Sequence, residues 1–108
     1  MSRTKTMWCQ LAENGQTRHF GPHPEVVRLY EPKLPVYAVT VTESKPTPDC
    51  YWAWWDRERE RFLFVYPARS LVSMCFPYGS KAEEDAGRGQ VLPVIVSLGE
   101  LVPPPARR

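Results

Sequence analysis

The sequence lacks a long apolar run, a strong net charge and any short catalytic, metal-binding or phosphate-binding motif. No apolar stretch approaches the roughly 18 residues of a membrane span, and the polar start MSRTKT has no apolar core of a secretion signal. Fourteen basic against twelve acidic residues leave a formal charge of +2, too little for the concentrated basic footprint of a duplex-binding protein. We expect a cytoplasmic protein without a cofactor, with no membrane contact and with nucleic acid disfavoured as a partner.

Cysteine is scarce, and its spacing excludes a disulfide framework. Cys9, Cys50 and Cys75 are odd in number and far apart, and no CxxC pair exists, so we expect reduced, mostly buried thiols. His19 and His23 have HxxxH spacing, but the Gly-Pro between them prevents the helix that would bring the rings together. A zinc site made from these histidines and two cysteines is therefore a minor alternative, and we predict no metal site.

Proline, in contrast, is abundant. Twelve prolines divide the 108 residues into short pieces, which disfavours long helices. The length suits one globular domain, predicted over residues 1–102, followed by a flexible Pro/Arg tail over residues 103–108. No internal repeat is visible.

The expected elements are short strands joined by turns. MWCQLAENGQTRHF predicts a β-hairpin around a two-residue type I′ turn at Asn14-Gly15. Residues 34–44 alternate Val and Thr as a strand does. A last strand begins at residue 91, and Pro93 confines its start to an edge or a bulge.

Helices are expected only as short pieces. Pro24 suits the first position of a helix over 24–31, although an extended connection is the alternative. Residues 70–76 are either a strand or a helix capped by Ser70, and we favour the helix. Residues 80–90 predict a capped helical turn that ends at Gly87 or a loop. Together these elements predict an α+β, mainly β fold: an antiparallel sheet of five to six strands with one or two short helices packed on one face.

The stretch YWAWWDRERERFLFVYPA, residues 51–68, holds three of the four tryptophans. A hairpin closed about Glu58-Arg59 pairs Trp55 with Phe62 and Trp54 with Leu63. Both faces of this hairpin are then apolar, whereas a strand with one solvated face alternates polar and apolar residues. The hairpin must therefore be sandwiched between two layers, or it must expose an aromatic patch.

These two alternatives give the aromatic side chains different roles. In the first they form the core of a small domain. In the second, part of the patch and the arginines at the hairpin tip contact a partner, since Trp, Tyr and Arg dominate interface hot spots. The candidate binding residues are Tyr51, Trp55, Arg57, Arg59, Arg61, Phe62 and Phe64.

Catalysis has no support from residue patterns. Cys75 lacks a nucleophile motif, and the carboxylates at 83–85 suit a solvated loop, so we predict no enzyme. Aromatic residues near arginines also suit single-stranded nucleic acid, but alternating acidic residues cancel much of the charge at the tip. The leading hypothesis is a non-catalytic protein-binding module. Its rivals are a single-stranded nucleic-acid-binding protein and a structural protein that forms homodimers.

Three stretches carry a resemblance of style to known proteins: MWCQLAENGQTRHFG, CYWAWWDRERERF and MCFPYGSKAEE. In these the chain resembles the small phage-encoded accessory and anti-defence proteins of the anti-CRISPR type, without a defining motif. The resemblance implies a compact inhibitor, acting in the host cytoplasm, that blocks a host or CRISPR-Cas defence complex by covering a protein surface. The near-neutral charge departs from the acidic members that imitate DNA, and favours contact with a protein subunit.

Overall fold

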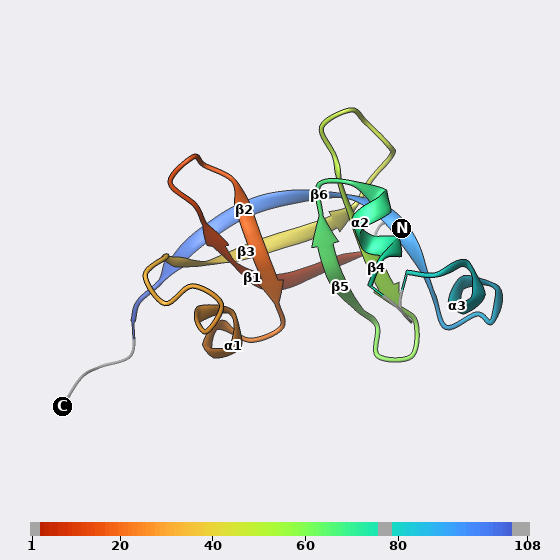
Figure 1. Cartoon of the computed structure of the whole chain (residues 1–108), viewed down its shortest axis with the longest axis horizontal. Helices are drawn as coiled ribbons and strands as arrows, with labels where there is room; N and C mark the ends of the chain where they lie inside the picture. The colour runs from red at the N-terminus through yellow and green to blue at the C-terminus, as the bar shows by residue number, and fades with distance from the viewer. Residues whose placement is uncertain (1–2, 76–78, 105–108) are drawn as a thin grey trace.

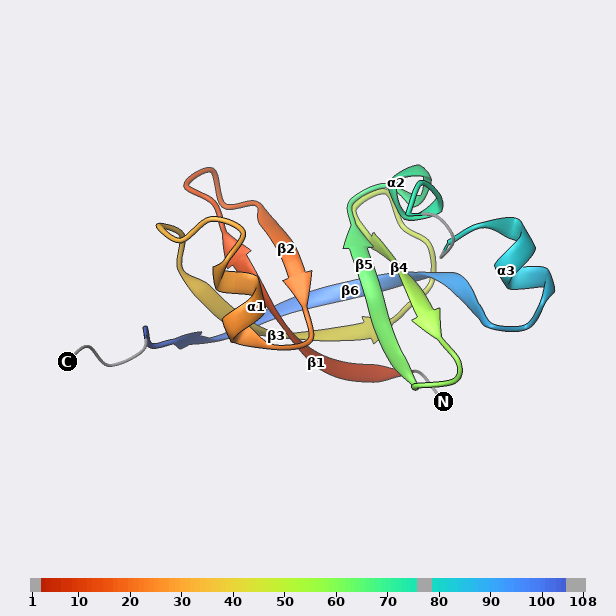
Figure 2. The ribbon, with the colours of Figure 1, turned by 60° about the horizontal axis from the view of Figure 1, so that its bottom comes forward.

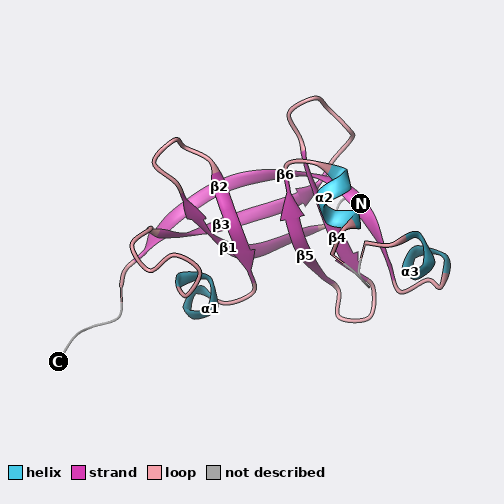
Figure 3. Ribbon diagram, in the orientation of Figure 1, coloured by secondary structure: helices cyan, strands magenta, loops and turns pink. Residues whose placement is uncertain are grey.

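The computed structural model describes residues 3–75 and 79–104. Within them, six antiparallel strands form one sheet in the order β2-β1-β3-β6-β4-β5, accompanied by three short helices (Figures 1 and 3). The strands are β1 (Thr4–Leu11), β2 (Thr17–Gly21), β3 (Val36–Glu43), β4 (Tyr51–Asp56), β5 (Arg61–Tyr66) and β6 (Gly89–Val102). The helices are α1 (Pro24–Arg28), α2 (Arg69–Ser73) and α3 (Lys81–Asp85). The mainly β, α+β class is confirmed, with one helix more than expected.

The sheet curls until its two edge strands meet. β2 and β5 contact each other, and Figure 2 shows them facing one another across the front of the curl. No backbone ladder joins them within the described residues. The inside of the curl holds the main core, which draws on both halves of the chain. Its buried members are Met7, Cys9, Val39, Val41, Ala53, Trp55, Phe62, Val65 and Val94.

The helices α1 and α2 lie near opposite ends of the sheet. Val72 of α2 packs with Trp54 and Val91 in a second buried cluster. Trp54 lies on the opposite side of β4 from Trp55, because neighbouring side chains of a strand point to opposite faces. α2 therefore covers the outer side of β4 and β6, and α1 packs against β1, β2 and β3 in the same way.

The strand order is symmetric about the centre of the sheet, because the chain contains two units with the same order of elements. The first comprises β1, β2, α1 and β3, and the second comprises β4, β5, α2 and β6, with α3 inserted before β6. In the sheet the edge strands β2 and β5, the next strands β1 and β4, and the central strands β3 and β6 occupy matching positions. An approximate twofold axis between β3 and β6 relates the two units.

Matching β-bulges support this relation. The ladder of β1 with β2 shifts next to Trp8, and the ladder of β4 with β5 shifts next to Trp52. In each bulge a non-glycine residue has a positive φ: 58° at His19 and 56° at Phe64. Positive φ is uncommon for residues other than glycine, so its recurrence at matching places indicates that both units use the same backbone path.

The ladders place the twofold axis at a single residue pair. Trp8 faces Ala38 on β3, and Trp52 faces Pro93 on β6. Three residues further along these strands are Val41 and Val96, and these two residues face each other. A residue that pairs with its own equivalent lies on the axis.

The structure therefore contains an internal repeat that is not visible in the sequence alone. The sequence signal is short: residues 36–41 read VYAVTV and residues 91–96 read VLPVIV, with valine at the first, fourth and sixth positions. Elsewhere a few equivalent residues are identical, such as Trp8 and Trp52 beside the bulges and Val27 and Val72 in the helices, but most differ in type.

The first hairpin has a longer loop than predicted. The amide of Ala12 donates to the carbonyl of Gln16, and the amide of Gly15 donates to the carbonyl of Ala12. Gly15 has φ +85°, whereas Asn14 does not have a positive φ. This is the three-residue loop in which a left-handed glycine follows an ordinary turn, so the two-residue type I′ turn is wrong. The side chain of Asn14 favours the longer loop by accepting from the Gln16 amide at 3.0 Å.

The second hairpin follows the predicted register near its turn and departs from it further on. The confirmed pairs are Trp55 with Phe62 and Trp54 with Leu63. Beyond the bulge Trp52 faces Tyr66, where the symmetric hairpin predicted Val65. The extra residue moves Val65 to the main core and Phe64 to the outer cluster.

The short helices begin close to the predicted residues. α1 begins at Pro24 as predicted, but α2 begins at Arg69 after Ala68, so Ser70 is not its cap. α3 is capped by Ser80, as its sequence predicts, with Gly87 beyond its end at φ +77°.

Pro93 lies in a central strand. Its carbonyl accepts from the Ser44 amide, just past the end of β3 at Glu43. In an antiparallel ladder the nitrogen and the carbonyl of one residue point to the same side. The missing N–H of Pro93 therefore faces Ser44, where the β3 ladder ends, and costs no bond between β6 and β4, although β6 is not an edge strand.

Candidate functional site

The structure does not bring the seven predicted binding residues to one surface. Trp55 and Phe62 are 5% and 2% exposed and pack edge to face at 4.9 Å between ring centres. The guanidinium of Arg3 lies 5.2 Å from the centre of the Trp55 ring. Tyr51 is half-buried, and its hydroxyl shares a 2.9 Å hydrogen bond with the hydroxyl of Thr17. Both faces of the aromatic hairpin are apolar as predicted, and both are largely covered.

The arginines at the hairpin tip surround a buried carboxylate. Asp56 is 5% exposed, and its Oδ1 accepts from the amides of Glu58 and Arg59. Its Oδ2 lies 3.5 Å from Nη1 of Arg59 and 3.6 Å from Nε of Arg61. Two of the three predicted arginines thus compensate a charge of the protein itself.

A hollow of about 460 Å³ separates this tip from the segment around α3. Its charged lining residues are Asp56, Arg57, Glu58, Arg59, Glu83 and Arg88. Three carboxylates and three guanidiniums leave no dominant charge, so this hollow has no preference for a polyanion.

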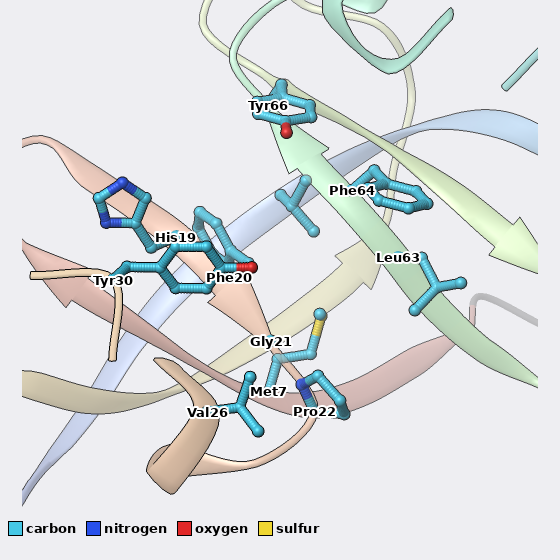
Figure 4. A pocket seen from close by; sticks show the side chains of 11 residues that line it. Met7, His19, Phe20, Gly21, Pro22, Val26, Tyr30, Leu63, Phe64 and Tyr66 are labelled. Atoms are coloured by element: carbon cyan, nitrogen blue, oxygen red, sulfur yellow. The ribbon is translucent and has the colours of Figure 1, made fainter. Parts of the chain in front are cut away.

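The most distinctive surface is the place where β2 and β5 meet, which we call the seam. Two hollows open along it, of about 240 and 310 Å³. The first is drawn in Figure 4, where His19, Phe20 and Tyr30 lie on one side and Leu63, Phe64 and Tyr66 on the other. The second is lined by residues 16–19 and 65–67 and by Leu71. The two hollows use equivalent parts of the two units, and His19, Val65 and Tyr66 contribute to both.

Exposed apolar side chains flank the seam in equivalent positions. Val26 of α1 is 45% exposed and lines the first hollow, and Leu71 of α2 is 40% exposed and lines the second. The C-cap residues that follow the two helices, Leu29 and Met74, are 77% and 76% exposed. Each unit thus exposes apolar side chains at the same two positions. Exposed apolar residues scattered singly over a protein surface do not repeat in this way.

His19, which lines both hollows, belongs to a group of polar contacts beside the seam. His19 is stacked on Tyr30 at 4.9 Å, and its Nδ1 lies 2.9 Å from Oε1 of Gln10. Gln10 is fully buried, and its Nε2 donates to the backbone carbonyl of Glu31 at 2.8 Å. The Glu31 carboxylate lies 3.5 Å from both His19 and Arg18. Sequence reasoning missed this site, because Gln10, His19 and Glu31 have no motif spacing.

Burial changes the acidity of two further groups. It raises the pKa of the Cys9 thiol, in the main core, to about 12. Burial, and secondarily the neighbouring Cys75, also raises the pKa of the Tyr66 hydroxyl at the seam. Both groups therefore stay protonated at neutral pH. All three cysteines are unpaired; Cys9 and Cys50 are buried and Cys75 is half-buried.

Comparisons with protein-family models, with curated proteins and with solved structures found no match. In the part of the chain that the structure describes, no three His, Cys, Asp or Glu residues gather as metal ligands. No helix in residues 3–75 or 79–104 has the length and apolar character needed to cross a membrane.

Proposed function

We propose that the protein is a non-catalytic protein-binding module that contacts its partner through the seam. The observation that carries this proposal is the pair of equivalent hollows, each flanked by an exposed apolar side chain, Val26 or Leu71. The partner is a protein that presents apolar side chains to both hollows. The proposed contact thereby moves from the hairpin tip and from Trp55 and Phe62, which belong to the core, to the seam, where Phe64 of the predicted set lines the first hollow.

The size and charge of the seam favour a protein over other ligands. Hollows of about 240 and 310 Å³ lie at or below the lower end of typical small-molecule pockets, which span roughly 300–1,000 Å³. They match single side chains inserted from a partner surface. A single-stranded nucleic acid is less favoured, since Arg59 and Arg61 compensate Asp56 and no stacked platform of exposed rings joins them within the described residues.

The resemblance to anti-CRISPR-type proteins adds a biological hypothesis. On that basis we propose that the partner is a subunit of a host or defence complex and that binding inhibits the complex. The near-neutral charge of the chain agrees with contact to a protein surface rather than imitation of DNA.

The test is a comparative capture with three matched baits. One bait is the natural chain, one carries Val26→Lys and Leu71→Lys at the seam, and one carries Ile95→Lys and Leu98→Lys. The control positions have similar exposure, 54% and 45%, but lie on β6. We expect at least one protein to be retained by the natural and control baits and lost by the seam bait, with little change when the salt is raised.

Two results would oppose the proposal. If every captured protein depends equally on the seam and control positions, the seam is not the contact surface. If binding disappears with salt and follows nucleic acid in the lysate, the module is a nucleic-acid binder instead. Thermal unfolding of the three baits establishes that all of them are folded.

A further inference from the structure

Aromatic rings gather around the mouth of the first hollow. Four phenylalanine and tyrosine residues line it, two from each unit: Phe20, Tyr30, Phe64 and Tyr66. The two tyrosines are 59% and 36% exposed, and Figure 4 shows the rings on both sides of the space between β2 and β5. A flat apolar group that enters this space therefore meets rings from both units.

Tyr30 also brings a hydrogen-bond donor to this mouth. Its ring is stacked on His19 at 4.9 Å between ring centres, and Figure 4 shows its hydroxyl directed toward the β5 side of the hollow. Tyr30 also contributes, after burial and Cys75, to the raised pKa of Tyr66, so its ring lies close to the other unit. Among the residues that the structure describes, the Tyr30 hydroxyl makes no hydrogen bond. A ligand in the hollow can therefore accept from it.

The seam is poorly suited to an ordinary extended peptide. Such a peptide has one N–H per residue, and each buried N–H needs an acceptor. The described residues that line the two hollows include no carboxylate. Addition as a further strand to β2 or β5 is also disfavoured, because each strand has a bulge in its middle, at His19 and at Phe64, and bulges protect the edges of sheets. A ligand with carbonyl acceptors and few N–H groups suits the seam better.

The two hollows adjoin, which favours an elongated ligand. His19, Val65 and Tyr66 line both of them. A polyproline II helix is an elongated ligand with three residues per turn and no internal hydrogen bonds, and its prolines have no N–H. Residues three apart in this helix point to the same side, so one segment presents prolines to both hollows. Aromatic-lined grooves are the sites that bind this conformation.

We propose that the seam binds a proline-rich segment of the partner protein in the polyproline II conformation, with prolines in both hollows and a carbonyl oxygen that accepts from the Tyr30 hydroxyl. This inference rests on the proposed function and adds the class of segment that the partner presents. Tyr30 and Tyr66 supply flat surfaces for the proline rings, and Val26 and Leu71 flank them. Because a polyproline II segment is already extended before binding, it loses little conformational entropy when it binds.

The test uses nonaproline made of L-proline, acetylated and amidated at its ends, with the D-proline peptide as the matched control. The two peptides have the same composition, but the D-peptide forms a helix of the opposite hand. Each is titrated into ¹⁵N-labelled natural chain and followed by NMR through the backbone amides. We expect the L-peptide alone to shift the amides of Gly21, Val65 and Tyr66, while those of Ile95 and Ser97 on β6 stay unchanged.

The matched variants are Tyr30→Phe, which removes the hydroxyl and keeps the ring, and Tyr37→Phe, which makes the same change on β3. We expect Tyr30→Phe to weaken the binding of L-nonaproline roughly two- to tenfold, as the loss of one net hydrogen bond predicts. Tyr37→Phe should leave the affinity unchanged. Equal binding of the L- and D-peptides to the natural chain, or no shift of the seam amides, would overturn the inference. These two outcomes need no variant and therefore do not depend on whether Tyr30→Phe folds.

The inference and the proposed function can fail separately. A captured protein that is lost by the Val26→Lys, Leu71→Lys bait but is not displaced by saturating L-nonaproline would support the seam and refute the proline-rich segment. If L-nonaproline binds the seam while no captured protein depends on it, the proposed function fails and the proline site stands. If the seam amides shift on dilution of the protein alone, a second copy of the chain fills the seam, and the assignment to a partner protein is refuted.

Discussion

At the residue scale, two buried polar side chains show how the chain uses polar groups inside a small fold. Asp56 closes the second hairpin by accepting from two backbone amides of the turn. Gln10 donates to the carbonyl of Glu31, which also accepts from the Leu34 amide and so closes the turn after α1, and the Gln10 oxygen faces His19. Both side chains therefore satisfy the backbone of a turn, Asp56 within its own hairpin and Gln10 across 21 residues of sequence.

The Cys9 thiol gives a prediction about pH. Burial raises its pKa from 9.0 to about 12, so between these values the unfolded chain loses a proton that the folded chain keeps. The free energy of unfolding then falls as the pH rises, by at most about 1.4 kcal/mol per pH unit from this group. We expect urea unfolding to show this fall between about pH 8 and about pH 10.5, with a shallower fall in Cys9→Ala.

The comparison of slopes separates Cys9 from other groups that titrate in this range. Cys9→Ala also leaves a small cavity, but the cost of that cavity does not change with pH. Equal slopes in the natural chain and the variant would contradict the assignment of this pH dependence to Cys9.

At the element scale, hairpins were easier to predict than their details. Alternation and turn residues locate both hairpins, and the register next to the second turn is confirmed by Trp55 and Phe62. The bulges at His19 and Phe64 have no local signal, because neither residue is a glycine. One extra residue in a bulge moves every later side chain to the other face, which is why the predicted grouping of Phe64 with Trp55 is wrong.

Two glycines give matched predictions about the strand elements. Gly15 has φ +85° and open space where a side chain would begin, whereas a methyl group at Gly89 would overlap the Trp55 carbonyl oxygen and the Trp54 ring. Gly15→Ala should therefore cost about 1 to 2 kcal/mol from backbone conformation alone. Gly89→Ala should cost on the order of 3 kcal/mol, because the β4–β6 ladder must move.

Urea unfolding of the two glycine variants measures these costs, and near-ultraviolet circular dichroism reports the packing of Trp54 and Trp55. We expect the dichroism to change in Gly89→Ala and to stay unchanged in Gly15→Ala. A larger loss of stability in Gly15→Ala than in Gly89→Ala would show that β4 and β6 are not in such close contact.

At the scale of the whole molecule, the sequence predicts the class of fold and not its symmetry. Strand periodicity and proline spacing indicate a mainly β, α+β chain, and the six antiparallel strands confirm it. The repeat is hard to detect in the sequence because few equivalent residues are identical and their spacing changes: Trp8 and Trp52 are 44 residues apart, whereas Val36 and Val91 are 55 apart. The seam escapes prediction as well, because it forms between β2 and β5, which meet only when the sheet curls. A surface that forms between two strands far apart in the sequence leaves no local pattern in that sequence.

The shared core decides whether the two units unfold together. Val27 in α1 and Val72 in α2 are equivalent and fully buried, and each Val→Ala change should cost about 2 kcal/mol through lost burial and cavity formation. Three of the four tryptophans lie in the second unit, so fluorescence mainly reports on that unit. Because residues of both units form the main core, we expect Val27→Ala to lower the urea midpoint of the fluorescence transition as much as Val72→Ala does. If Val72→Ala lowers the urea midpoint of the fluorescence transition and Val27→Ala does not, the two units unfold separately. The seam, which is formed by both units, would then not be held in one fixed geometry.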